Sequence, residues 1–242
     1  MVDPRTSVID ERLSGIGRII AVSSGKGGVG KSLVATTLAL TLSRKGFKVG
    51  LFDLDFTSPS THIILGAGEA KPKEDRGLLP SLISGLEYMS LIYYTSDQAA
   101  PLRGLDTSNA LIELLAVTRW GKLDFLVIDM PPGIGDAVLD LIRLVQNIEF
   151  LVVTTSSQLA FVTVKKFVTL LKEMQVEVLG VLENMKMNGS DEIKAKTKEL
   201  GISFLGEIRY DPKVEKAIGK EARLLNTAIA QRIKKMVESE LC

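Results

Sequence analysis

The chain has very few residues that could form a disulfide or a thiolate metal site. Among its 242 residues there is one cysteine, Cys242, and one histidine, His62. A disulfide needs two cysteines, and zinc or iron–sulfur sites usually need several cysteine or histidine ligands. The sequence therefore excludes an intrachain disulfide, and we expect no intrachain iron–sulfur site. A metal site here needs carboxylates, or ligands from two chains.

The chain also lacks an excess of charge and a long apolar run. Lys and Arg total 30, Asp and Glu total 29, and the net charge is +1. No overall field attracts such a chain to nucleic acid or to an anionic membrane. The longest uncharged stretch, 150–164, contains Thr, Ser and Gln and is shorter than the roughly 20 apolar residues that a spanning helix needs. We expect a soluble protein whose partners include neither nucleic acid nor membrane.

The first residues differ from a secretory signal, because Asp3, Arg5 and Asp10 stand where such a signal has an apolar core. We therefore expect a cytoplasmic protein. Apolar residues of segment 1–17 share one helical face, which predicts a helix that either caps the core or docks a partner protein. Residues 18–242 show no linker and no repeat, so we expect them to form one domain.

Short aliphatic runs alternate with longer helical patterns along this domain. Buried parallel strands read as such continuous apolar runs, and alternating strands and helices predict βαβ units. We predict an α/β fold with three layers, doubly wound around a mainly parallel sheet. Segment 67–76 has Gly, Pro and charged residues, and we expect a surface excursion there. The predicted strands are 18–23, 49–53, 125–129, 150–155 and 176–183, and the predicted helices are 31–44, 109–118, 136–145, 159–174 and 192–200.

A glycine-rich loop follows the first predicted strand and precedes a good helix. It matches the pattern G-x-x-x-x-G-K-[ST] of the phosphate loop in P-loop NTPases, in the required strand–loop–helix context. Glycines let consecutive backbone N–H groups converge on phosphate oxygens, and the helix N-terminus adds its dipole. Lys31 is expected to reach the β- and γ-phosphates, and the Ser32 hydroxyl to ligate Mg²⁺. The predicted nucleotide-binding residues are Gly25, Lys26, Gly27, Gly28, Val29, Gly30, Lys31, Ser32 and Leu33.

Three aspartates lie at the ends of predicted strands, at the edge of the sheet where open α/β sheets bind ligands. Asp53 ends the second predicted strand and Asp55 follows it, and their spacing suits one carboxylate near hydrated Mg²⁺ and the other near an attacking water. Asp129 ends an apolar strand in the manner of a Walker B motif, which usually holds Mg²⁺ through water. The guanine-reading motif Asn-Lys-x-Asp is absent from the sequence, which favours ATP over GTP.

The loop Gly25-Lys26-Gly27-Gly28-Val29-Gly30-Lys31-Ser32 resembles the deviant phosphate loop of the MinD/ParA group of ATPases. The stretch 123–136, with its Pro-Pro-Gly, resembles the Mrp (ApbC-like) branch of that group. The resemblance implies a homodimer with nucleotide at the interface, in which Lys26 reaches the partner's nucleotide. It also implies that Asp55 orients water, that Asp53 belongs to the metal shell, that Asn184 contacts adenine, and that the loop around Asp211 closes over the base.

One feature of the Mrp branch is missing. Cluster carriers of this branch typically have a Cys-x-x-Cys shortly after the Glu-Asn-Met segment, where this chain reads Met185-Lys186-Met187-Asn188. An archaeal subgroup of Mrp/MinD-type ATPases acts in nickel–iron hydrogenase maturation with a HypA-like partner, and the chain resembles it at Pro101-Leu102-Arg103-Gly104. We therefore predict a slow, dimeric Mg-ATPase in metallocentre assembly, serving either hydrogenase maturation or iron–sulfur assembly with an apo-metalloprotein partner. The alternative is a MinD/ParA-like positioning ATPase that binds membrane or DNA.

Overall fold

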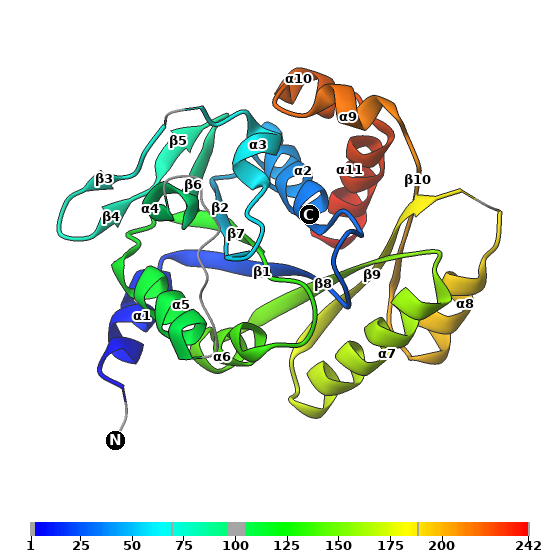
Figure 1. Cartoon of the computed structure of the whole chain (residues 1–242), viewed down its shortest axis with the longest axis horizontal. Helices are drawn as coiled ribbons and strands as arrows, with labels where there is room; N and C mark the ends of the chain where they lie inside the picture. Colours follow the sequence, from blue (N-terminus) through cyan, green and yellow to red (C-terminus); the bar gives the residue numbers. More distant parts are fainter. Residues whose placement is uncertain (1–2, 69, 96–104, 188, 242) are drawn as a thin grey trace.

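Eight strands form one central sheet in the computed structural model, which describes residues 3–68, 70–95, 105–187 and 189–241. The strands are β1 (Ile16–Ser24), β2 (Val49–Asp53), β5 (Ser81–Ile83), β6 (Leu86–Ser90), β7 (Leu123–Asp129), β8 (Ile148–Thr155), β9 (Glu177–Lys186) and β10 (Phe204–Arg209). Their order is β10-β9-β8-β1-β7-β2-β6-β5 (Figure 1). All neighbours pair in parallel except β5 and β6.

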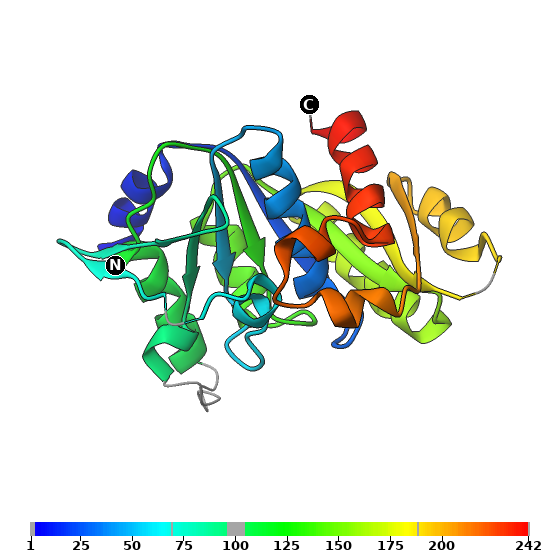
Figure 2. The same cartoon turned by 90° about the horizontal axis from the view of Figure 1, so that it is seen from above.

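Helices cover both faces of the sheet and make three layers, which Figure 2 shows from above. One face carries α2 (Lys31–Arg44), α3 (Thr61–Leu65), α9 (Lys213–Ala217), α10 (Glu221–Leu224) and α11 (Ala228–Glu240). The other face carries α1 (Arg5–Leu13), α5 (Leu105–Val117), α6 (Asp136–Leu144), α7 (Gln158–Glu173) and α8 (Glu192–Glu199). The short helix α4 (Ile92–Thr95) follows β6.

The central strands are continuous apolar runs because each strand supplies two cores. Ile20 and Val127 belong to the core under α2 and α11, whereas their neighbours Ala21 and Ile128 belong to the core under α5, α6 and α7. All four side chains are fully buried. A strand covered on both faces has no solvent side that would need polar residues.

The predicted fold class is confirmed, and all five predicted strands are present. Strands β5, β6 and β10 were not predicted, because they are short or interrupted by polar residues and Gly206. The predicted excursion at 67–76 holds a small hairpin, in which β3 (Lys73–Glu74) pairs with β4 (Leu78–Leu79).

The two terminal helices both pack on the domain. Ile9 and Leu13 of α1 are buried against α5, which favours the core-capping alternative for the N-terminal segment. The apolar stripe of α11, which includes Ile233 and Val237, is buried against α2 and β10. No helix among the described residues is both long and apolar enough to cross a membrane. Cys242 and the Pro101–Gly104 segment lie outside the described residues.

Candidate functional site

The glycine-rich loop lies between β1 and α2, at the carboxyl edge of the sheet. It lines a cavity of about 390 Å³, here called the phosphate cavity after its predicted ligand, together with the segment after β2 and Pro132. The loop residues on this cavity are Gly27, Gly28, Gly30, Lys31, Ser32 and Leu33. Gly30 has a φ of 82°, and a Cβ there would lie 2.4 Å from the Asn184 side chain, so only glycine fits. The backbone is thus shaped for a close-fitting ligand at a helix N-terminus.

Lys31 is the centre of a buried charge cluster. Its Nζ lies 2.6 Å from Oδ1 of Asp129 and 3.5 Å from Oδ2 of Asp55, and it is 3.3 Å from the Ser32 hydroxyl. Asp53 joins the cluster because its residue pairs with Asp129 across β2 and β7. Lys31 and the three aspartates are all buried. Three carboxyl groups thus share one ammonium, so the cluster would carry an excess of negative charge if all three were ionised.

Burial controls the protonation of this cluster. It raises the pKa of the Asp129 carboxyl to about 7, although Lys31 opposes part of that rise. Burial also raises the pKa of Asp53 to about 6, against hydrogen bonds from Thr61 and Asp55. An added cation would favour the ionised forms of both carboxyls.

The described oxygens fit a hard divalent cation such as Mg²⁺. Oδ2 of Asp129 is buried and accepts no hydrogen bond among the described residues. The Ser32 hydroxyl lies beside Lys31 in the same cavity. Both are oxygen ligands of the kind that Mg²⁺ prefers, directly or through water. Asp53 is the third predicted metal residue. Its carboxylate accepts three hydrogen bonds within the protein, from the amides of Asp55 and Thr61 and from the Thr61 hydroxyl.

Asp55 lines the cavity, as its predicted role beside an attacking water requires. Its Oδ1 accepts hydrogen bonds from the Thr57 hydroxyl at 2.8 Å and the Ser58 amide at 3.1 Å, and Oδ2 faces Lys31. The carboxylate is therefore held by its own loop on one side and by an ammonium on the other.

The Pro-Pro-Gly stretch after β7 contacts the start of the glycine-rich loop. The Gly133 amide donates to the Ser24 carbonyl at 2.8 Å, and Pro132 lines the cavity. The loop after the Walker B strand is therefore positioned to respond to whatever occupies the phosphate cavity.

A second, smaller cavity of about 180 Å³, here called the base cavity after its predicted ligand, shares Leu33 and Ile64 with the first. Its walls are mostly apolar, and they bring together the predicted base-contacting residues Asn184 and Asp211. Asn184 is buried, and its Nδ2 donates to the Val29 carbonyl at 2.9 Å. The remaining lining residues are Met185, Ile208, Arg209, Tyr210, Pro212, Val214, Glu215, Ile218 and Ile229. The shape and composition suit a flat, uncharged ring system such as a nucleobase.

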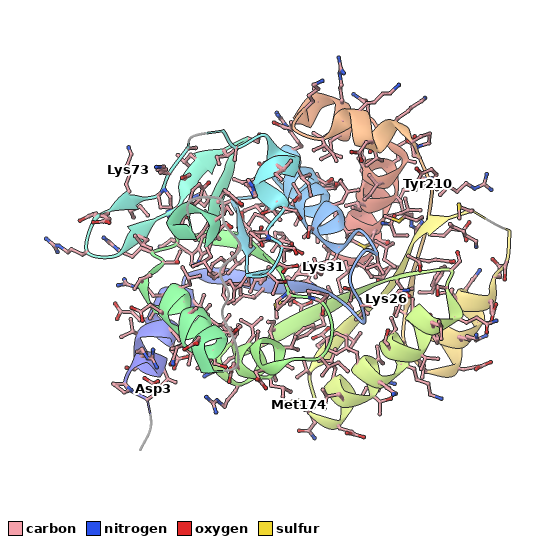
Figure 3. The ribbon with its side chains drawn as sticks, viewed as in Figure 1. Asp3, Lys26, Lys31, Lys73, Met174 and Tyr210 are labelled. Atoms are coloured by element: carbon pink, nitrogen blue, oxygen red, sulfur yellow. The ribbon has the colours of Figure 1, made fainter. Side chains whose placement is uncertain are left out.

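The Asp211 side chain forms hydrogen bonds with backbone amides in this structure. Its Oδ1 accepts from the Lys213 amide at 2.9 Å, and its Oδ2 accepts from the Ala228 amide at 3.5 Å. These bonds tie the starts of α9 and α11 to the loop that borders the base cavity. Tyr210, labelled with Lys26 and Lys31 in Figure 3, is 59% exposed next to it.

The remaining loop residues lie around the cavity without lining it. Val29 is buried, and Gly25 packs closely on α7, where an added Cβ would lie 2.2 Å from the Thr163 hydroxyl. Lys26 is exposed and makes no ion pair with another residue in the described part of the chain. Its side chain is therefore available to a second molecule.

The segment where cluster carriers of the Mrp branch have thiols holds a buried ion cluster here. Lys186 forms an ion pair with Glu207 and lies 3.7 Å from Oε2 of Glu183. The hydrogen bond that Lys186 donates to the Glu207 carboxylate raises the pKa of Lys186. Ser156 donates to Oε1 of Glu183 at 2.7 Å. An ion pair thus joins the ends of β9 and β10, and a hydrogen bond joins the segment after β8 to β9.

Sequence reasoning missed several residues of the site. Ile64 separates the two cavities, and Met185 and Tyr210 line the base cavity. None of them carries a motif, although Met185 and Tyr210 stand next to the predicted Asn184 and Asp211. Thr61, which donates to Asp53, and Tyr88, which contacts the Thr61 hydroxyl, have no signal in the sequence.

Comparison with known proteins agrees with this geometry. The family profile of the NUBPL iron-transfer P-loop NTPases, of ParA type, matches residues 15–240. The chain belongs to this family. Its relatives include the iron-sulfur cluster carrier proteins of Aquifex aeolicus, with 38% identity over 84% of this chain and 60% of that protein, and of Methanococcus maripaludis, with 32% identity over 100% and 90%. The chain spans about half to three-fifths of the length of several curated relatives that it matches.

Solved structures show the same architecture. An Archaeoglobus fulgidus nucleotide-binding protein, solved in complex with ADP, has a TM-score of 0.77 and 31% identity, covering 98% of this chain and 97% of that one. The cell division ATPase MinD of Pyrococcus furiosus has a TM-score of 0.68 at 20% identity, covering 92% and 98%, and shows the shared fold. The predicted membership of the Mrp branch of the MinD/ParA group is confirmed.

Proposed function

We propose that this protein is a Mg²⁺-dependent ATPase with a low turnover rate, which works as a homodimer in metallocentre assembly. The observation that carries the proposal is the buried cluster of Lys31, Asp55 and Asp129 beside a glycine-rich loop, next to a base-sized cavity. Family membership supports the same conclusion.

Each residue of the cluster has a distinct role in this proposal. The loop amides and Lys31 bind the phosphates, and Asp55 orients the attacking water and accepts its proton. Ser32 and Asp129 would hold Mg²⁺, with Asp53 in its outer shell, and bound Mg²⁺ supplies charge neutralisation of the phosphates. Asn184 and the segment around Asp211 bind the base. The base is adenine in this proposal, because the sequence lacks the guanine-reading motif Asn-Lys-x-Asp.

The support for a homodimer comes from the surface beside the glycine-rich loop. Gly25 packs on Thr163 of α7, so the start of this helix adjoins Lys26. On the same helix Leu159 is 78% exposed and Val162 is 52% exposed. An apolar patch next to an unpaired, exposed lysine suits a second copy of the chain, and Lys26 would then approach the nucleotide of that copy.

Two kinds of metal cargo fit the family. Relatives are named iron-sulfur cluster carrier proteins, which supports a role in iron–sulfur assembly. This chain offers Lys186 with its acidic partners where carriers of the Mrp branch have thiols, and thioether and ammonium groups do not replace thiolates in a cluster. That difference supports nickel–iron hydrogenase maturation with a HypA-like partner as the second candidate.

Anaerobic reconstitution with iron and sulfide separates these two candidates. The wild type and Cys242→Ser are compared by visible charge-transfer absorbance and by bound iron per chain. Cluster uptake that is lost in the variant supports a carrier in which Cys242 of two chains contributes ligands. Absence of uptake in both proteins favours a role without a bound cluster, and nickel transfer from a HypA-like partner is then measured.

A MinD/ParA-like positioning role predicts ATP-dependent binding to membrane or DNA. Co-sedimentation with anionic liposomes and with duplex DNA, each with and without ATP, tests that alternative. ATP-dependent co-sedimentation with either would contradict the metallocentre proposal.

A further inference from the structure

A chain of buried hydroxyl groups leads from Asp53 away from the nucleotide site. The Thr61 hydroxyl donates to Oδ2 of Asp53 at 2.5 Å, and the Tyr88 hydroxyl lies 2.9 Å from the same threonine oxygen. All three side chains are at most 1% exposed. They come from three elements: the end of β2, the start of α3, and β6.

The direction of each hydrogen bond follows from the donors available. A hydroxyl has one proton, and the Thr61 proton is directed to the carboxylate of Asp53. The Tyr88 O–H therefore donates to Thr61. Tyr88 thus stabilises Thr61 as a donor, and hydrogen bonds in such a chain strengthen one another in a buried setting.

Asp53 also caps the short helix α3 from the end of the preceding strand. The first amides of a helix have no partner within it, and Ser60, which precedes α3, offers no side-chain hydrogen bond. The Thr61 amide donates instead to Oδ2 of Asp53 at 3.3 Å. Asp53 thereby fixes both the backbone and the side chain of Thr61.

These bonds close a loop that carries the water-orienting residue. Residues 54–60 run between Asp53 and Thr61, and the Asp53–Thr61 contact joins the two ends of this segment. Within it, Asp55 lines the phosphate cavity and is held by Thr57 and Ser58. The position of the Asp55 carboxylate therefore depends on contacts made behind the cavity.

We propose that Thr61 and Tyr88 are positioning residues for ATP hydrolysis, which act through Asp53 to hold Asp55 at the phosphate cavity. This inference rests on the proposed ATPase function. Neither residue lines the phosphate cavity or the base cavity, so neither contacts the nucleotide from its present place. Removing the hydroxyl contact changes turnover, and nucleotide affinity stays the same because Lys31 and the glycine-rich loop are untouched.

The test compares Thr61→Val, Thr61→Ser and Tyr88→Phe with a control variant. Thr197 is also a fully buried threonine, but its hydroxyl donates to the Ile193 carbonyl within α8, far along the chain from the site. Thr197→Val therefore makes the same chemical change without touching Asp53. For each protein we measure kcat and KM for Mg-ATP, the Kd for ADP, and amide hydrogen exchange across 54–65.

We expect Thr61→Val to lower kcat by about tenfold or more, since small displacements of catalytic groups have effects of that size. KM and the ADP Kd are expected to stay within about threefold of wild type. Thr61→Ser, which keeps the hydroxyl, restores kcat to within about threefold, and Tyr88→Phe lowers it by about threefold. Exchange across 54–65 becomes faster in Thr61→Val than in Thr197→Val.

Three results would overturn the inference: a wild-type kcat in Thr61→Val, no recovery in Thr61→Ser, or a kcat loss in Thr197→Val equal to that in Thr61→Val. Failure of the proposed function is distinguishable from these. If the wild type neither binds ADP nor hydrolyses ATP, the ATPase proposal fails by itself. The exchange comparison then still decides whether Thr61 holds the 54–60 segment.

Discussion

The phosphate end of the nucleotide site consists of buried charges on two neighbouring strand ends and one loop, with Lys31 Nζ 2.6 Å from Asp129 and 3.5 Å from Asp55. The base end is a small, mostly apolar cavity whose walls come from the end of β9, the segment after β10, and α11. At the phosphate end the electrostatic interactions are already assembled. At the base end the fit depends on one buried amide, that of Asn184, and on a partly exposed segment.

This difference assigns separate tasks to the two ends. The Lys31 ammonium and the backbone amides at a helix N-terminus give affinity for phosphate whatever the base is. An apolar cavity adds affinity by burying the base, and its few polar groups discriminate between bases. Variants at the phosphate end should therefore change affinity and turnover for every nucleotide, and variants at the base end should change the choice among nucleotides.

The largest effect is expected for Lys31→Ala. The change removes the only described ammonium within 4 Å of Asp55 and Asp129 and leaves their charges unbalanced. We expect the Kd for ADP to rise by about a hundredfold or more, measured by calorimetric titration. Lys45→Ala, which removes an exposed lysine paired with Glu238 just after α2, is the control. Retained ADP affinity in Lys31→Ala would refute the phosphate-site assignment.

The next effect is a pH dependence of the free energy of unfolding, which arises from the phosphate end alone. Asp53 and Asp129 have pKa values of about 6 and 7 in the folded chain, above their ordinary value near 4. Between these values the folded state holds protons that the unfolded state has released, so the free energy of unfolding falls as pH rises from about 4 to about 7.

We expect a loss of several kcal/mol for the nucleotide-free, metal-free protein, measured by urea unfolding at several pH values. Asp129→Asn should reduce this slope, because Asn does not titrate. An equal slope in the variant, or stability that rises over this range, would show that the two carboxyls are not the cause.

A smaller effect is expected for Asp55→Asn, which should change the rate of ATP hydrolysis and leave nucleotide affinity as it is. The variant keeps Lys31 and the loop amides, so the ADP Kd should stay within about threefold of wild type. The rate of ATP hydrolysis should fall by about tenfold or more, since an amide cannot accept the proton of the attacking water. A coupled phosphate-release assay measures the rate, and a wild-type rate would remove Asp55 from the mechanism.

The smallest effect is expected at the base end. Asn184→Ala removes the bond to the Val29 carbonyl and a cavity wall. We expect the ADP Kd to rise by about fivefold, in line with one hydrogen bond, and the Kd for pyrophosphate to stay unchanged. Asn226→Ala, at an exposed asparagine that bonds only within its own short segment, is the control. Equal losses for ADP and pyrophosphate in Asn184→Ala would show that the two ends do not act separately.

The phosphate end could be predicted from the sequence because its determinants are local. The glycine-rich loop is one continuous motif, and Asp53 and Asp129 each end an apolar run whose strand neighbours bring them together. The base end required the family resemblance, since Asn184 and Asp211 are far from the loop in the chain and no periodicity joins them.

Other contacts could not be predicted from the sequence because they join segments that carry no pattern. Strand β6 mixes polar and apolar residues, so the position of Tyr88 next to Thr61 was not visible before the fold was known. The ion pair of Lys186 with Glu207 depends on the pairing of β9 with β10, a strand that the sequence did not predict.

The most direct test of the account is calorimetric titration of the wild-type protein with Mg-ADP and Mg-GDP under the same conditions. A phosphate end joined to an adenine-sized base end predicts one ADP per chain, with GDP binding about tenfold more weakly or worse. Equal affinity for the two nucleotides would contradict the assignment of the base cavity. Absence of ADP binding would contradict the nucleotide site as a whole.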